Sequence, residues 1–103
     1  MSVLITDGES HVTLAAVRSL GRGGLEVTSG SPFEHAMSFY SKYCSHRFVY
    51  PNPREREGDF VDKLEKELEK EDYEVLFPGD SGSHMQVSRN RKTLSKNTLS
   101  KKT

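Results

Sequence analysis

The stretch Val3-Leu4-Ile5-Thr6-Asp7-Gly8-Glu9-Ser10-His11 decides the fold of this chain. Its apolar run is typical of a short buried strand, and the run stops at a polar turn that contains a glycine. The residues after the turn follow a helical pattern as far as Gly21, which is placed to end the helix. A strand, a tight turn and a helix in this order open a nucleotide-binding-like α/β fold, in which ligands sit at the turn.

The first 80 residues continue this alternation of strand and helix patterns. Residues 25–29, 47–50 and 73–77 are typical of three further strands, with helical patterns between them. Strands separated by helices need crossover connections, which make the strands parallel and place helices on both faces of the sheet. The sequence therefore predicts an α/β fold with three α/β/α layers around a small, mainly parallel, four-stranded sheet of rudimentary Rossmann-like type.

The apolar positions within the helical patterns predict which side chains are buried. Ser31 followed by Pro32 and a nearby glutamate has the composition of a helix start. The remaining positions recur at helical spacing. The expected buried faces are Val12, Ala15, Ala16, Ser19 and Leu20 in the first helix; Phe33, Met37, Tyr40 and Cys44 in the second; Phe60, Val61, Leu64 and Leu68 in the third; and Met85 and Leu94 in the last.

Length and composition favour one domain. With 103 residues and 33% hydrophobic content, the chain can bury one modest core, which we assign to residues 1–96, followed by a basic and frayed tail over residues 97–103. No apolar segment approaches the roughly 20 residues that span a bilayer, and the start lacks a signal-peptide pattern. The single cysteine rules out an internal disulfide framework. We therefore expect a cytoplasmic protein without a membrane partner.

The net charge of zero hides an asymmetry between the two ends of the chain. Residues 1–80 carry 9 Lys and Arg against 15 Asp and Glu, whereas residues 81–103 carry 6 Lys and Arg and no acid. A basic tail of this kind would suit nucleic acid or an acidic surface. No aromatic residue follows Phe77, however, so the tail lacks the stacking groups that single-stranded nucleic acid uses. We do not expect nucleic acid as a partner.

Five segments together resemble a known family. They keep their order and spacing along most of the chain, and they are residues 3–8, 15–24, 41–44, the predicted fourth strand running into Pro78-Gly79-Asp80, and residues 88–95. The chain resembles the small N-terminal domain of the ATP-grasp superfamily, the pre-ATP-grasp domain, in the branch similar to the large subunit of carbamoyl-phosphate synthase.

The resemblance implies a piece, or a stand-alone relic, of a carboxylate–amine ligase. ATP-grasp enzymes activate a carboxylate as an acyl phosphate and pass it to an amine, with ATP and magnesium held between two later domains. It implies no cofactor in this chain, no catalysis by the chain alone, and partnership with ATP-grasp catalytic domains in the same or a neighbouring polypeptide. The small first domain contributes to the substrate side of the cleft.

Two turns are the candidate substrate-binding site. Helix N-termini and the carboxyl ends of parallel strands favour ligands, and the first and fourth strands are expected to be neighbours. The alternative for the first turn is structural, with a glycine making the turn and a serine capping the helix. The turns contain neither a dinucleotide fingerprint nor a phosphate-binding loop, and a phospho-acceptor pocket would need an acid pair and a lysine that are not evident. The predicted substrate-binding residues are Asp7, Gly8, Ser10, Gly79 and Asp80, with no catalytic or metal-binding residue.

The segment Cys44-Ser45-His46 raises the question of a metal site or a nucleophile. A structural zinc site needs four ligands at paired spacings, which one cysteine and four scattered histidines do not supply. We interpret Cys44 as a buried thiol. The alternative function for the whole chain is a non-catalytic module that binds a small anion or, through its tail, nucleic acid.

Overall fold

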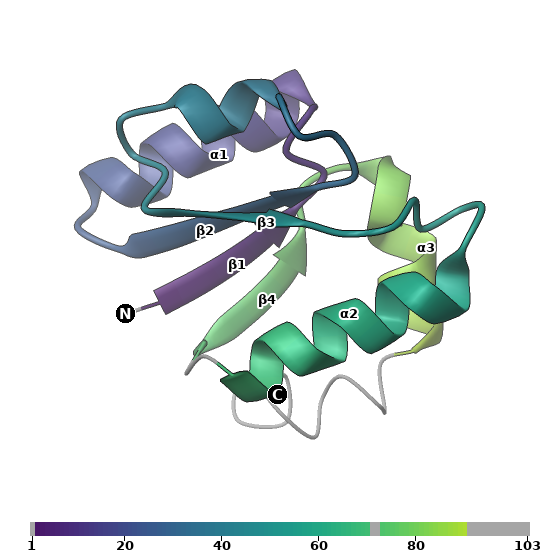
Figure 1. Ribbon diagram of the computed structural model, residues 1–103. Coiled ribbons are helices and arrows are strands. Elements are labelled where there is room, and N and C mark those ends of the chain that lie inside the picture. The colour runs from purple at the N-terminus through teal and green to yellow at the C-terminus, as the bar shows by residue number, and fades with distance from the viewer. Residues whose placement is uncertain (1, 71–72, 91–103) are drawn as a thin grey trace.

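The computed structural model describes residues 2–70 and 73–90 of the chain (Figure 1). Within this part, four strands form one parallel sheet in the order β3-β2-β1-β4. The predicted α/β fold is confirmed, and so is the placement of the first strand beside the fourth. The strands are β1 (Ser2–Thr6), β2 (Glu26–Ser31), β3 (His46–Val49) and β4 (Val75–Pro78); the helices are α1 (His11–Arg22), the 3₁₀ helix η1 (Met37–Tyr40), α2 (Glu57–Lys70) and α3 (Ser81–Arg89).

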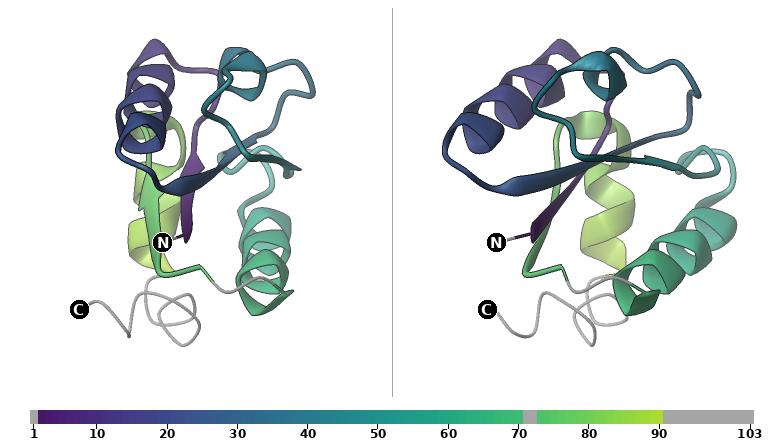
Figure 2. Two further views of the ribbon diagram at one scale, coloured as in Figure 1. Left: turned by 90° about the vertical axis from the view of Figure 1, so that its left-hand side faces the viewer. Right: turned by 60° about the vertical axis from the view of Figure 1, so that its left-hand side comes forward.

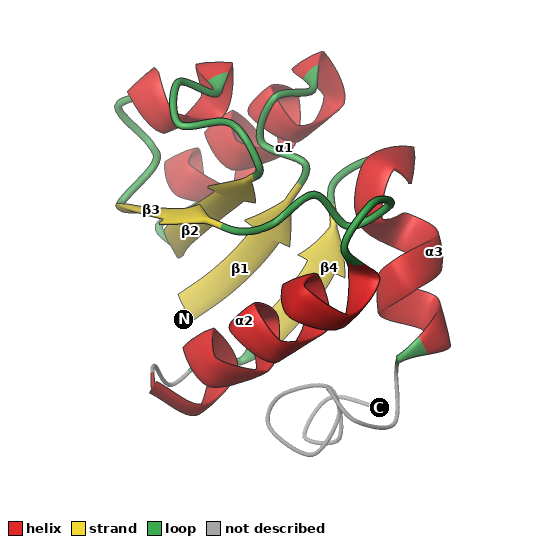
Figure 3. Ribbon diagram, turned by 45° about the vertical axis from the view of Figure 1, so that its right-hand side comes forward, coloured by secondary structure: helices red, strands yellow, loops and turns green. Residues whose placement is uncertain are grey.

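Helices cover both faces of the sheet. Figure 2 shows α1 and α2 on opposite sides of the strands, and Figure 3 shows the same layers coloured by element type. Successive side chains of a strand point to opposite faces, so β1 supplies both cores. Val3 and Ile5 pack on the α1 side with Val17, whereas Leu4 packs on the α2 side with Leu64. Val87 of α3 joins the α2 side.

The α2 side holds the larger core. Leu4, Phe60 and Leu64 are fully buried there, and the rings of Tyr50 and Phe60 pack edge to face with 4.9 Å between their centroids. Burying an aliphatic or phenyl side chain of this size contributes about 1.5–3 kcal/mol. The four apolar positions predicted for the third helix, Phe60, Val61, Leu64 and Leu68, are all buried in α2.

The helix predicted from Ser31 to Cys44 is wrong. Strand β2 continues to Ser31, whose hydroxyl accepts a bond from the Phe33 amide in a turn, and only the four residues of η1 are helical. The reason is tertiary: residues 30 and 31 pair with β3, and this pairing overrides the local capping signal. Phe33, Met37 and Tyr40 are exposed as a result.

Two predicted helix faces are also wrong in part. Val12 and Met85 are 59% and 61% exposed, and Ala15 and Ser19 of the predicted first-helix face are exposed too. In α1 a polar residue takes the buried position instead, because the Thr13 hydroxyl donates to the Thr6 carbonyl at the end of β1. In α3 the buried residues are Ser83, Gln86 and Val87.

Some predictions lie at or beyond the limits of the described chain. Leu94, the end of the domain at residue 96 and the tail over residues 97–103 fall outside the described residues. Over residues 2–70 and 73–90, no helix combines the length and the apolar character needed to cross a bilayer.

Replacing Leu64 and Met85 by alanine separates the observed packing from the predicted one. Leu64 is fully buried in α2, so Leu64→Ala should lower the free energy of unfolding by about 2–5 kcal/mol. Met85 is largely exposed, so Met85→Ala should change it by no more than about 0.5 kcal/mol. Urea denaturation measures both. Equal losses of unfolding free energy in the two variants would contradict the orientation of α3 in which Met85 faces solvent.

Candidate functional site

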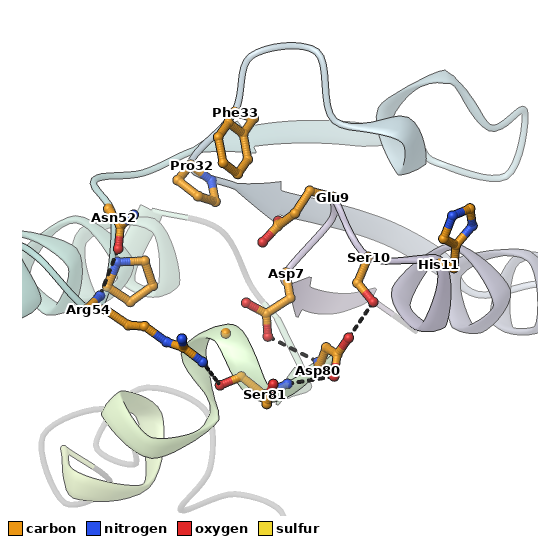
Figure 4. A pocket seen from close by; sticks show the side chains of 12 residues that line it. Asp7, Glu9, Ser10, His11, Pro32, Phe33, Asn52, Arg54, Asp80 and Ser81 are labelled. Carbon is orange, nitrogen blue, oxygen red and sulfur yellow. Dashed lines mark hydrogen bonds between the residues drawn. The ribbon is translucent and has the colours of Figure 1, made fainter.

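A pocket of about 530 Å³ lies at the carboxyl ends of the strands (Figure 4). Loops that follow all four strands contribute to it, as expected where a parallel sheet reverses its strand order. The lining residues are Asp7, Glu9, Ser10 and His11 after β1; Pro32 and Phe33 after β2; Asn52, Pro53 and Arg54 after β3; and Asp80, Ser81 and Gly82 after β4.

The backbone of Asp7 is held in an unusual conformation at the end of β1. Its φ of 64° lies in the left-handed region, which aspartate tolerates better than most residues. The Asp7 amide donates to the hydroxyl of buried Tyr50 at 2.9 Å, and the next amide, of Gly8, donates to the Gly30 carbonyl at 2.8 Å. A Cβ on Gly30 would lie 2.8 Å from the Tyr50 ring, so a glycine in β2 makes room for the tyrosine.

The Asp7 carboxylate occupies the N-terminus of α3. Its Oδ2 accepts bonds from the amides of Asp80 at 3.0 Å and Ser83 at 3.2 Å, and from the Ser83 hydroxyl at 3.0 Å. Because that hydroxyl has one proton, Ser83 Oγ must accept its 2.6 Å bond from Thr6 Oγ1. The helix end that the sequence suggests for an external anion therefore already holds a carboxylate of the protein.

The caps of two helices are joined to each other. Ser10 caps α1 by accepting from the Val12 amide at 3.1 Å, and Asp80 caps α3 by accepting from the Ser81 amide at 2.7 Å. The Ser10 hydroxyl then donates to the other Asp80 oxygen at 2.5 Å. The loops after β1 and β4 are thus locked together on one side of the pocket.

The two aspartates have opposite protonation tendencies. Burial raises the pKa of Asp7, and the bonds from Ser83 and Asp80 offset this rise in part, whereas the nearby charge of Glu9 adds to it. The hydrogen bond from Ser10 lowers the pKa of Asp80.

On the opposite side of the pocket, Arg54 Nη2 donates to the Ser81 carbonyl at 3.4 Å.

The structure brings three of the predicted site residues into the pocket. Asp7, Ser10 and Asp80 line it, although more than 70 residues separate the two turns in sequence. Gly8 and Gly79 lie behind the lining: a Cβ on Gly8 would meet the Ser38 and Ser29 hydroxyls, and Gly79 packs against α1. The clustering of the two turns is confirmed, and their role in substrate binding stays a prediction.

Several lining residues escaped the sequence reasoning. Phe33 was assigned to a helix face and Arg54 was not considered, although each follows a strand. Gly82 belonged to the second candidate turn but was not among the predicted binding residues. The rule that ligands lie beyond the carboxyl ends of parallel strands, applied to all four predicted strands instead of two, would have found these loops.

Cys44 is half-buried against the core on the α1 side, and its Sγ donates to the His46 carbonyl. Burial raises the pKa of this thiol, which favours its protonated form. Over the described part of the chain, no three His, Cys, Asp or Glu side chains are grouped so that they share one metal ion.

Comparison with known proteins finds no match to a family model, a curated protein or a solved structure.

Replacing Asp7 by asparagine tests the effect of burial on its carboxylate. Asparagine also tolerates the left-handed backbone, so Asp7→Asn changes mainly the charge. The folded-state pKa of Asp7 is raised, so its contribution to stability is lost as the pH rises through that value and regained on acidification. The unfolding free energy of the wild type minus that of Asp7→Asn should increase from pH 7 to about pH 4. Urea denaturation measures this difference at each pH. A difference that decreases on acidification would show that the hydrogen bonds to Asp7 lower its pKa by more than burial raises it.

Gly79 should not tolerate a side chain. A Cβ there would lie 2.0 Å from Thr13 Oγ1 and 2.5 Å from the Thr6 carbonyl oxygen. We expect Gly79→Ala to destabilise the fold by about 1–3 kcal/mol or more, because the loop must move away from α1. Gly58→Ala is the matched control, since a Cβ there meets nothing within 4 Å. Thermal unfolding that gives both variants the same Tm would contradict this packing.

Proposed function

We propose that this chain is the substrate-side domain of an ATP-grasp-type carboxylate–amine ligase, in which it binds a small polar molecule and does no chemistry alone. The observation that carries the proposal is the pocket, which lies at the strand-order reversal of a β3-β2-β1-β4 parallel sheet and is lined by all four strand-end loops. This is where open α/β sheets bind ligands. The proposal places the protein in the cytoplasm, in keeping with its free cysteine.

The internal bonding of the pocket favours binding over catalysis. Both oxygens of Asp80 and one of Asp7 are engaged by neighbouring groups, so the wall they form is rigid before any ligand arrives. Such preorganisation lowers the entropic cost of binding. The loop after β1 also carries two carboxylates where a phosphate-binding loop carries glycines and a lysine. We assign ATP and magnesium to further domains.

The surface beside the pocket supports a neighbouring domain as partner. Phe33 is 56% exposed and lines the pocket, and Met37 lies next to it along the same hollow, which is shared with Pro32 and Ala36. Large apolar side chains that stay exposed beside a ligand site are typical of surfaces that pack against another domain. We propose that this is where the catalytic domains would meet the chain.

The second candidate, a small-anion-binding module, is favoured by one observation. Arg54 lines the pocket and forms no ion pair with the carboxylates there. The nucleic-acid version depends on the tail, which lies outside the described residues.

Deletion of residues 91–103 should leave the retention of the protein on heparin unchanged. Salt-dependent retention that this deletion removes would favour a module that binds nucleic acid.

A genetic test addresses the ligase itself. The reading frame beyond codon 103, or an adjacent gene, should encode an ATP-binding half that co-purifies with this domain. ATP hydrolysis by the pair should depend on both parts and on an added carboxylate substrate. Hydrolysis that continues without this domain, or the lack of any such half, would contradict the proposal.

The isolated chain should neither hydrolyse ATP nor bind magnesium-ATP tightly. Phosphoryl transfer depends on preorganised cations around the phosphates, and the pocket instead presents Asp7, Glu9 and Asp80. Isothermal titration calorimetry with magnesium-ATP should show no micromolar binding. Micromolar binding that requires magnesium would contradict the assignment of ATP to other domains.

A further inference from the structure

Three cations contact two tyrosine rings on the α1 side of the sheet. Arg22 Cζ lies 5.7 Å and Lys42 Nζ lies 5.2 Å from the centroid of the Tyr43 ring. Arg47 Cζ, in β3, lies 5.0 Å from the centroid of the Tyr40 ring. These distances are those of cation–π contacts, which hold a positive group over a ring. None of these residues lines the pocket at the strand ends.

The two groups of contacts belong to one surface. Tyr40 and Tyr43 are three residues apart, so their Cα atoms lie within about 11 Å of each other. Figure 1 shows the loop from η1 to β3 beside the C-terminal end of α1, where a Cβ on Gly21 would lie 2.4 Å from the Tyr43 Cβ. Arg18 precedes Arg22 by four residues and so shares its side of α1. We call this set the cationic surface: Arg18, Arg22, Tyr40, Lys42, Tyr43 and Arg47.

The cations of this surface form no ion pair within the described part of the chain, where the salt bridges join other residues. Residues 10–25 and 35–54 contain no Asp or Glu, so α1, η1 and β3 carry no acid. Glu26, the first acid after α1, lies 3.4 Å from His46. It points to the α2 side, because the next residue, Val27, packs in the core on the α1 side. The cationic surface therefore suits an anionic partner.

The aromatic rings narrow the class of that partner. Tyr40 is 60% exposed although the His35 ring stacks near it, and Tyr43 is partly exposed. Single-stranded nucleic acids bind surfaces on which cations and exposed rings alternate, because phosphates contact the cations and bases stack on the rings. An acidic protein surface would need the cations alone.

We propose that the cationic surface binds single-stranded nucleic acid, with phosphates against Arg22, Lys42 and Arg47 and a base stacked on Tyr40. This function goes beyond the proposed ligase role and does not depend on it. The sequence shows no aromatic residue in its basic tail, whereas the fold brings rings and cations together from α1, η1 and β3 and the loop before β3.

The test is a fluorescence-anisotropy titration of a labelled oligothymidine with the full chain. Three phosphate contacts on a single strand predict that the affinity falls about 20-fold when the salt concentration rises fourfold, from about 50 to about 200 mM.

Two variants locate the phosphate contacts. Lys42→Gln and Arg47→Gln each remove one cation, so each should weaken oligothymidine binding several-fold and make it less dependent on salt. Lys63→Gln and Lys66→Gln are the matched controls. They remove the same charge from exposed positions of α2, on the opposite side of the sheet, and should bind as the wild type does.

Tyr40→Leu separates the bases from the phosphates. It keeps an exposed apolar side chain but removes the ring, so it should weaken oligothymidine binding about fivefold or more. Heparin is a polyanion without bases, and its binding should not change. An equal loss of affinity for both probes would overturn the assignment to nucleic acid and favour a general anionic partner.

Three further outcomes would overturn the proposal. Binding by Lys42→Gln and Arg47→Gln that equals that of the α2 controls would show that this surface is not the site. Binding that is lost on deletion of residues 91–103 would place the site on the tail. No binding of oligothymidine at about 50 mM salt would overturn it outright. The ligase proposal stands or falls separately, with the ATP-hydrolysis test of the two parts together.

Discussion

The carboxylate of Asp7 at the N-terminus of α3 is the interaction on which the rest of the site depends. It joins the end of β1 to the first turn of a helix that begins more than 70 residues later, through two amides and a hydroxyl. Without an acceptor there, the Ser83 amide in the first turn of α3 would be buried without a partner, a cost of about 1–3 kcal/mol. The parallel pairing of β1 with β4 brings the two loops together, and the carboxylate fixes them in one geometry.

This arrangement combines a favourable interaction with an unfavourable one. The helix end favours a negative charge, whereas burial disfavours it and raises the pKa of Asp7. The left-handed backbone at Asp7 adds strain. The Tyr50 hydroxyl accepts a bond from the Asp7 amide in this conformation, and Gly30, which has no side chain, leaves room for the Tyr50 ring. A costly buried charge beside a pocket is typical of positions kept for binding, where strain and burial cluster.

The sequence was sufficient for the architecture and for half of the site. Strand and helix periods predicted the parallel sheet, and the strand order predicted that Asp7 and Asp80 would meet. The sequence around Ser31 could not reveal that the predicted helix is absent. Its residues have the composition of a helix start, and only the pairing of β2 with β3, far along the chain, overrides that preference. Likewise, Thr13 has no apolar signature, and it is buried because Thr6 offers its hydroxyl a carbonyl. Arg54 enters the site through the loop after β3, whose position depends on tertiary packing.

A double-mutant cycle between Asp7 and Ser83 tests the central claim most directly. Urea denaturation of Asp7→Ala, Ser83→Ala and the double variant gives the coupling free energy, and the backbone strain at position 7 cancels in the cycle. A carboxylate that joins β1 to α3 predicts a coupling of about 1–3 kcal/mol for this pair. The same cycle with Ser88→Ala, an exposed serine of the same helix, should give a coupling below about 0.5 kcal/mol. Additive losses for Asp7 and Ser83 would contradict the account.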